Sequence, residues 1–167
     1  MTADVLIVLH AEADLARGGS SLTPCGLQQA AAVADRLAVA RPALLLSEPA
    51  DAAALTAEAI AQAVALSSTA TDDLSEGGRL NRAMHRAARH AEHGPAVLVT
   101  DSAATVDLLR SIMGERQLEH RYPGAISEGL PDTAVTHVML TPGDEARVVS
   151  VADVGHLAAG LVTGHLP

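Results

Sequence analysis

The sequence predicts an α/β fold, a three-layer sandwich in which helices cover both faces of a mostly parallel central sheet. The apolar runs at residues 4–9 and 96–100 contain β-branched side chains and are typical of strands buried on both faces. Helical patterns alternate with such runs along the chain, as in folds with a parallel sheet. A chain of 167 residues is long enough to bury a substantial core, and no linker or repeat interrupts it. We therefore expect one domain over residues 1–167.

The first half of the chain begins with the strand at 4–9, followed by a polar loop at 11–21. Thr23 suits a helix cap and Pro24 the first helical position, so a helix is expected from 24 to about 40. A strand at 43–46, a helix capped by Asp51 and running to about 66, and a short strand at 68–71 follow. The inner face of the first helix is expected to hold Leu27, Ala30, Ala31, Ala34 and Leu37.

The second half is predicted to begin with a polar loop at 72–79 and a basic helix from 80 to about 91. After the strand at 96–100, a helix at 102–113 is closed by Gly114. Residues 115–132 are expected to be irregular. The alternating segments 133–140 and 146–151 flank a turn at 142–144 and predict a hairpin. The tail from 153 is expected to be loop with a short helix.

Composition excludes several classes of function. The net charge is −9, which disfavours nucleic acid and anionic membrane surfaces as partners. No apolar run reaches the roughly 18 residues of a membrane span, and the N-terminus lacks the basic region of a signal peptide. The single cysteine, Cys25, excludes an internal disulfide and a multi-cysteine metal site, and a buried, inert thiol is the simpler interpretation. We expect a cytoplasmic protein without a cofactor or a metal.

Polar residues follow the predicted parallel strands at the points where ligands bind in open α/β sheets. His10 follows the first strand, Glu48 and Pro49 follow the second, and Asp101 follows the strand at 96–100. Because the carboxyl ends of parallel strands meet at one edge, His10 and Asp101 are expected to face the same cleft. Glu76, in the loop after Leu74, is expected to join them.

Six motifs occur in a specific order along almost the whole chain. They are Leu9-His10-Ala11-Glu12, the segment 22–30 (LTPCGLQQA), the segment 47–58 (SEPADAAALTAE), Asp73-Leu74-Ser75-Glu76, the segment 97–102 (VLVTDS) and the segment 151–157 (VADVGHL). In this order and spacing they resemble the histidine phosphatase superfamily, which includes the cofactor-dependent phosphoglycerate mutases. The resemblance implies a phosphoglycerate mutase-like fold.

The same resemblance implies roles for particular residues, and the departures from the family pattern alter the expected chemistry. The nucleophilic histidine corresponds to His10 and the acidic proton donor to Glu76. The two phosphate-binding arginines correspond to Leu9 and Ala52, and the second catalytic histidine corresponds to Asp101. Loss of one preorganised donor commonly costs about 10²- to 10³-fold in rate. We therefore expect a degenerate member, a pseudoenzyme that has lost phosphoryl transfer.

Three functions stay open. In the first, the vestigial cleft binds a small molecule or a protein partner without catalysis. In the second, a repurposed enzyme of the isomerase, cyclase or lyase type uses His10, Asp101 and Glu76 as acid and base groups. In the third, the protein is a weak phosphatase. His10 and Asp101 form either a general-base dyad or an ion pair that fills a former active site, and no local spacing demands that they bind a metal with Glu76.

Further residues are expected at the rim of the cleft. Glu12, Ser102 and His156 are candidate substrate-binding residues. Glu12 is equally suited to hydrogen-bond its own loop, and Ser102 to cap the helix that follows it. The basic helix places Arg82, Arg86 and Arg89 on one face, which suits an acidic partner or a phosphate-bearing ligand, although a solvated face is the simpler interpretation.

Overall fold

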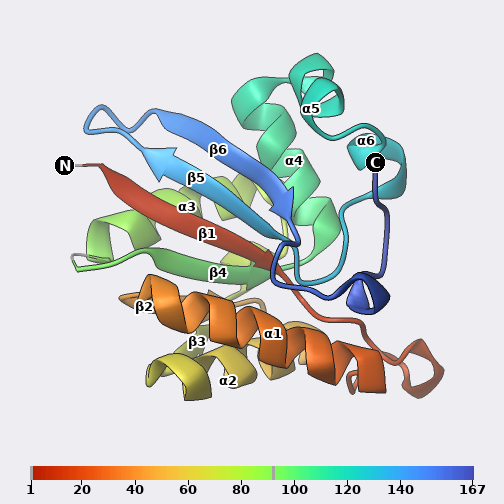
Figure 1. Cartoon of the computed structure of the whole chain (residues 1–167). Coiled ribbons are helices and arrows are strands. Elements are labelled where there is room, and N and C mark those ends of the chain that lie inside the picture. The colour runs from red at the N-terminus through yellow and green to blue at the C-terminus, as the bar shows by residue number, and fades with distance from the viewer. Residues whose placement is uncertain (1, 92) are drawn as a thin grey trace.

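A six-stranded sheet forms the centre of the computed structural model, which describes residues 2–91 and 93–167. The strands lie in the order β3-β2-β4-β1-β5-β6 (Figure 1). The first four of these are parallel, whereas β5 is antiparallel to β1 and β6 is antiparallel to β5. The strands are β1 (Ala3–Leu9), β2 (Leu44–Ser47), β3 (Ser68–Ala70), β4 (Ala96–Thr100), β5 (Val135–Leu140) and β6 (Ala146–Asp153).

Helices cover both faces of this sheet, which confirms the predicted three-layer fold. In Figure 1, α1 and α2 lie on one face, and α3 and α4 lie on the other. The helices are α1 (Pro24–Ala40), α2 (Asp51–Val64), α3 (Gly77–His90), α4 (Ser102–Met113), α5 (Glu115–Arg121) and α6 (Ala125–Glu128). Short 3-10 turns are η1 (Leu15–Arg17), η2 (Asp72–Leu74) and η3 (Ala159–Leu161).

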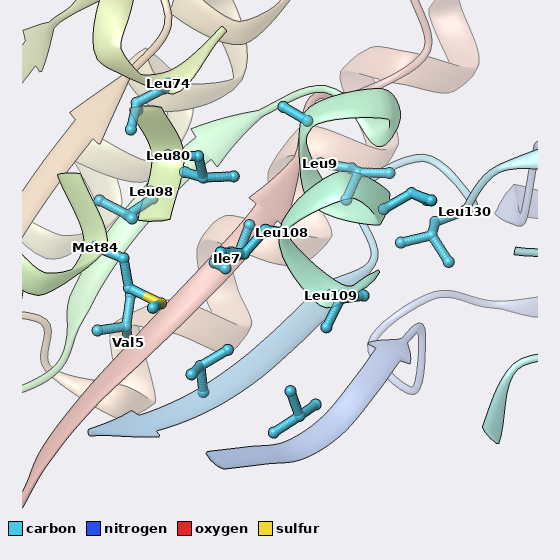
Figure 2. Packing of buried hydrophobic residues seen from close by; sticks show 14 of the residues in the cluster. Val5, Ile7, Leu9, Leu74, Leu80, Met84, Leu98, Leu108, Leu109 and Leu130 are labelled. Atoms are coloured by element: carbon cyan, nitrogen blue, oxygen red, sulfur yellow. The ribbon is translucent and has the colours of Figure 1, made fainter. Parts of the chain in front are cut away.

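The core divides into two layers because successive strand residues point to opposite faces of the sheet. Val8 and Val97 pack beneath α1 and α2, whereas Ile7 and Leu98 pack beneath α3 and α4. Figure 2 shows the second layer, with Leu108 of α4 lying over β1. These side chains are fully buried, so the strands are covered on both faces, as their continuous apolar sequence predicts.

The only aromatic residue of the chain, Tyr122, joins the C-terminal tail to the body of the protein. It follows α5 and is 6% exposed. Its hydroxyl donates to the His165 carbonyl at 2.9 Å, and the His165 ring stands edge-on to it at a centroid distance of 6.0 Å. The tail is therefore packed against the α5–α6 region.

The inner face of α1 differs from the prediction. Leu27 is 61% exposed and Ala31 is also exposed, whereas Gln29 and Val33 are fully buried. Gly26 lies on the buried face, where a Cβ atom would stand 2.2 Å from the Glu12 carbonyl oxygen. The face of α1 that contains Gly26, Gln29 and Val33 therefore packs against the protein. The hydrophobic pattern of the sequence gives no sign of this close backbone approach. Thr23 caps α1 as predicted, and accepts from the Gly26 N–H at 2.9 Å.

Two predicted loops contain helix. The segment 72–79 forms η2 and the start of α3, which begins at Gly77 rather than residue 80. A Cβ atom at Gly77 would lie 2.4 Å from the Asp107 Cβ of α4, so close helix packing rather than turn propensity explains this glycine. The segment 115–132, predicted to be irregular, contains α5 and α6. Glu119 stabilises their junction, since its carboxylate accepts from the N–H groups of Gly124 and Ile126, each at 2.9 Å.

Candidate functional site

Three polar residues lie side by side where parallel strands end. In the sheet, Leu9 of β1 pairs with Thr100 of β4, and Ser47 of β2 pairs with Val99 of β4. The ladder continues one step further, since the His10 N–H donates to the Thr100 carbonyl at 3.0 Å and the Glu48 N–H donates to the Val99 carbonyl at 3.0 Å. His10, Asp101 and Glu48 therefore follow three adjacent strands at one edge of the sheet. We call these three residues the strand-end group.

The ring of His10 is half-buried and held in one tautomer. Its Nδ1 lies 2.9 Å from the Ala11 carbonyl oxygen, which only accepts hydrogen bonds, so Nδ1 carries the hydrogen. The neutral ring then presents Nε2 as a base or hydrogen-bond acceptor. The Ala11 N–H is in turn bonded to the Thr56 hydroxyl at 2.9 Å, and that hydroxyl donates to the Ala52 carbonyl at 2.7 Å. Through these bonds α2 fixes the loop that carries His10.

Asp101 caps α4. Its Oδ1 accepts from the Ala104 N–H at 2.7 Å, and the carboxylate is half-buried. Among the described residues, the side-chain hydrogen bonds of His10 and Asp101 go to Ala11 and Ala104 respectively, and none joins the two side chains. Ser102, the predicted cap, instead accepts from the Leu130 N–H at 2.8 Å and so anchors the loop after α6. The helix therefore uses the carboxylate that the sequence analysis paired with His10.

Glu48 completes the group, and the sequence analysis did not select it as a site residue. It is 4% exposed, and burial and then the charge of Asp101 raise the pKa of its carboxyl, against a smaller opposite effect of His10. The neighbouring Thr100 hydroxyl donates its single hydrogen to the Leu74 carbonyl at 2.6 Å. His10 and Asp101 were chosen as site residues because each directly follows an apolar strand. Glu48 has the same position after β2 and could have been chosen on the same ground.

A third carboxyl, that of Asp132, also lies near His10. The pKa of Asp132 is raised, mainly by burial and to a smaller extent by the charge of Glu12. Two effects oppose this rise, namely the hydrogen bond that the Thr163 hydroxyl donates at 2.7 Å and the charge of His10. The buried amide of Gln29 donates to Thr163 at 2.6 Å and accepts from the Glu12 N–H at 2.9 Å. This chain of bonds ties the C-terminal tail to the loop after β1.

The predicted rim residues Glu12 and His156 take part in structural contacts. Glu12 accepts from the Thr23 hydroxyl at 2.6 Å, so its carboxylate hydrogen-bonds the start of α1. His156 accepts from Arg36 at 3.1 Å through Nδ1, and its Nε2 lies 3.3 Å from the Thr133 hydroxyl. Burial, and then the charge of Arg36, lower the pKa of His156 from 6.5 to about 4. The His156 ring is therefore neutral at physiological pH.

Glu76 lies apart from the strand-end group in its bonding. It is exposed, and its carboxylate lies 3.4 Å from Nε of Arg79, one turn further along α3. The structure thus brings His10, Asp101 and Glu48 together, places Glu76 at the start of α3 in an ion pair with Arg79, and leaves its predicted role beside His10 a prediction.

The two positions where arginines are implied by the family resemblance are apolar and packed. Leu9 is 2% exposed within the layer beneath α3 and α4, and Ala52 is 7% exposed in a small cluster with Ala11, Leu22 and Ala30. In the part of the chain that the structure describes, no arginine is bonded to the strand-end group. No group of three or more His, Cys, Asp or Glu side chains within 2–91 and 93–167 is arranged to hold a metal ion. Among the described residues, the group therefore contains two carboxyls with no arginine bonded to them.

Comparison with known proteins establishes the class to which this fold and strand-end histidine belong. Residues 5–96 match the model of the histidine phosphatase superfamily (branch 1), and the chain belongs to this superfamily. No curated protein matches the chain. Within the described residues, no helix has both the length and the apolar character needed to cross a membrane.

Solved structures share the fold at low sequence identity. YhfR of Bacillus stearothermophilus superposes with a TM-score of 0.77 at 15% identity, covering 92% of this chain and 98% of that one. A phosphoserine phosphatase from Entamoeba histolytica, in complex with 3-phosphoglyceric acid, gives 0.73 at 16% identity over 93% and 100% of the two chains. The putative phosphohistidine phosphatase SixA from Agrobacterium tumefaciens gives 0.67 at 20% identity over 89% and 96%. These likenesses show the fold.

Proposed function

We propose that this superfamily member does not transfer phosphoryl groups and instead binds a small amine-bearing molecule at the strand-end group. One observation carries the proposal, namely the buried carboxyl of Glu48 beside Asp101 and His10. The carboxyls of Glu48 and Asp101 place negative charge at this edge of the sheet, where the family resemblance implies arginines and a second histidine. The ligand class follows from that change of sign.

Phosphate is a poor ligand for such a group. Two unit charges 4 Å apart interact by about 4 kcal/mol at an effective dielectric constant of about 20, so each neighbouring carboxylate repels a phosphoryl dianion strongly. The packed side chains of Leu9 and Ala52 offer no charge to offset this repulsion. The tautomer of His10 still presents Nε2, but a nucleophile without a clamp for the anion lacks most of the transition-state stabilisation.

A protonated amine suits the same group. An ammonium group favours the ionised form of Glu48 and thereby offsets the free-energy cost of burying that charge. His10 Nε2 accepts a hydrogen bond from an N–H group, because the hydrogen of the neutral ring is on Nδ1. The free energy of binding therefore comes from relief of an unfavourable charge arrangement already present in the free protein.

A second function is favoured by the contrast between His10 and Glu48. The neutral tautomer of His10 presents Nε2 as a base, and burial raises the pKa of Glu48, so a candidate base and a candidate acid lie on the strand ends either side of β4. Such a pair suits proton transfer on a neutral or amine-bearing substrate, in an isomerase, cyclase or lyase. In this reading Glu48 takes the acid role that the sequence analysis gave to Glu76.

Thermal unfolding with added ligands tests the main proposal. Putrescine or ethanolamine at millimolar concentration is expected to raise Tm in proportion to ln(1 + [L]/Kd), relative to NaCl of equal ionic strength. The increase should be lost in Glu48→Gln and kept in Glu58→Gln, a matched change on the exposed face of α2. An increase with phosphate or vanadate that depends on His10, or His10-dependent hydrolysis of a phosphate ester, would contradict it.

A further inference from the structure

A second candidate binding site lies on the α3 side of the sheet, and none of its lining residues belongs to the strand-end group. Here β2 and the edge strand β3 extend beyond the cover of α3, leaving a groove of about 430 Å³. Leu44 and Leu46 of β2 and Ala87 of α3 form its apolar surface. A groove of this volume falls within the range of small-molecule sites.

Polar groups flank the apolar surface on both sides. Thr69 and Thr71, on and just after β3, line one side, and Arg86 and His90 of α3 line the other. The Nδ1 of His90 lies 2.8 Å from the Arg86 carbonyl and therefore carries the hydrogen, which leaves Nε2 as the open ring nitrogen. Arg86 is half-exposed and donates through one Nη to Asp73 at 2.5 Å. A guanidinium has five N–H donors, so this bond leaves most of them available.

The charge of this region is opposite to that of the whole protein. The net charge is −9, yet α3 carries Arg79, Arg82, Arg86 and Arg89, four of the eleven basic residues. An anion is therefore attracted to this helix and repelled from most of the remaining surface. Asp73 already neutralises part of the Arg86 charge. The remaining positive charge suits a ligand with one negative charge better than a ligand with two.

We propose that this groove binds a small amphipathic monocarboxylate. Its apolar body lies on Leu44, Leu46 and Ala87, and its carboxylate accepts from the free N–H groups of Arg86 beside His90. The two sites share no residue, because the groove is lined by Leu44 and Leu46 of β2 whereas Glu48 follows the end of that strand. The groove proposal stands independently of the amine site, and the two have ligands of opposite charge.

Titration with hexanoate, followed by methyl and amide NMR of the whole chain, tests the groove. Shifts are expected at Leu44, Leu46 and Ala87, with hexanol and hexylamine at the same concentrations giving much weaker binding. Arg86→Gln should weaken hexanoate binding about tenfold, as expected for loss of one charge-assisted hydrogen bond. Arg89 lies three residues further along α3 and lines a different pocket, so Arg89→Gln should leave the Kd for hexanoate unchanged within about twofold.

Asp73→Asn gives a test in the opposite direction. This change keeps Arg86 but removes the carboxylate that competes for it, so hexanoate is expected to bind a few-fold more tightly. Hexanol binding as tightly as hexanoate, equal Kd values in the wild type and Arg86→Gln, or shifts confined to residues outside the groove would each overturn the proposal. Asp73→Asn is expected to increase the affinity for hexanoate, and a variant that folds poorly would not show such an increase.

Discussion

At the scale of single residues, Glu48 is expected to cost the protein stability at neutral pH. Burial and Asp101 raise the pKa of this carboxyl in the folded state, so ionisation is harder there than in the unfolded chain. The stability that Glu48 contributes is present at low pH and is lost as the pH rises through the folded pKa. Glu48→Gln should therefore raise the unfolding free energy at pH 7 by on the order of 1 kcal/mol, or about 3 °C in Tm.

Urea unfolding of the wild type and Glu48→Gln at pH 4 and pH 7 measures this effect. The gain should shrink at pH 4, where the Glu48 carboxyl approaches the protonated form in both states. Glu58→Gln, on the exposed surface of α2, serves as the control and should change stability little at either pH. Equal stability of the wild type and Glu48→Gln at pH 7 would show that the carboxyl is compensated in the folded protein.

His156 is expected to have the opposite pH dependence. Its pKa falls from 6.5 to about 4 on folding, so the unfolded chain binds the proton more readily. The resulting stability is complete above about pH 6.5 and is lost as the pH falls toward 4. The loss is on the order of 1–2 kcal/mol once partial solvent exposure is allowed for. His156→Gln keeps one acceptor and one donor without titrating, and should remove this part of the pH dependence.

The difference in urea midpoint between His156→Gln and the wild type, measured from pH 7 to pH 4.5, isolates this group from the carboxyls. His120→Gln is the matched control, because His120 is exposed on α5. Parallel pH profiles for His156→Gln and the wild type would mean that the ring does not titrate on unfolding as we expect.

At the scale of elements, α1 offers a test of helix phase. Leu37 is 1% exposed and packs in the layer above Val8, whereas Leu27 is 61% exposed on the same helix. Leu37→Ala should reduce the unfolding free energy by about 3 kcal/mol through lost burial and the cavity left behind. Leu27→Ala should change it by less than about 0.5 kcal/mol. Equal losses in urea unfolding would show that the face predicted from sequence, with Leu27 inward, is the correct one.

The elements also show what the sequence can predict. Capping by Thr23, closure by Gly114 and the apolar run of β4 are local signals, and each element they define is found at the expected residues. The errors occur where distant contacts decide. Gly77, at the start of α3, packs so closely on Asp107 that only glycine fits, and Gly26 does the same against the Glu12 backbone, on the side of α1 away from the exposed Leu27. Neither contact has a local signature.

For the candidate site, the sequence predicts the positions of the residues along the strands but not their hydrogen bonds. Its place at the carboxyl ends of parallel strands follows from the fold, and His10 and Asp101 lie there as expected. Glu48 carries the same strand-end signal. What the sequence does not supply is the hydrogen bonding, because capping of α4 by Asp101 and the pairing of Glu76 with Arg79 depend on side-chain orientation.

At the scale of the whole molecule, the net charge of −9 should make stability depend on salt. The described ion pairs are mostly between exposed side chains and contribute little. Repulsion among the excess carboxylates opposes the compact state and is screened at higher ionic strength. Raising NaCl from 10 to 200 mM should increase the unfolding free energy measured in urea by on the order of 1 kcal/mol, and KCl should act alike. A decrease would show that the ion pairs outweigh the repulsion.

The lone tyrosine has a consequence for optical experiments. Because the chain has one Tyr and no Trp, its intrinsic ultraviolet emission comes from a single ring, at the contact between Tyr122 and the tail residue His165. That emission reports on detachment of the tail, whereas circular dichroism reports on the helices. A fluorescence transition that precedes the dichroism transition would mark a sub-global opening in which the tail leaves Tyr122 and Thr163 loses its bond to Asp132 while the sheet stays folded.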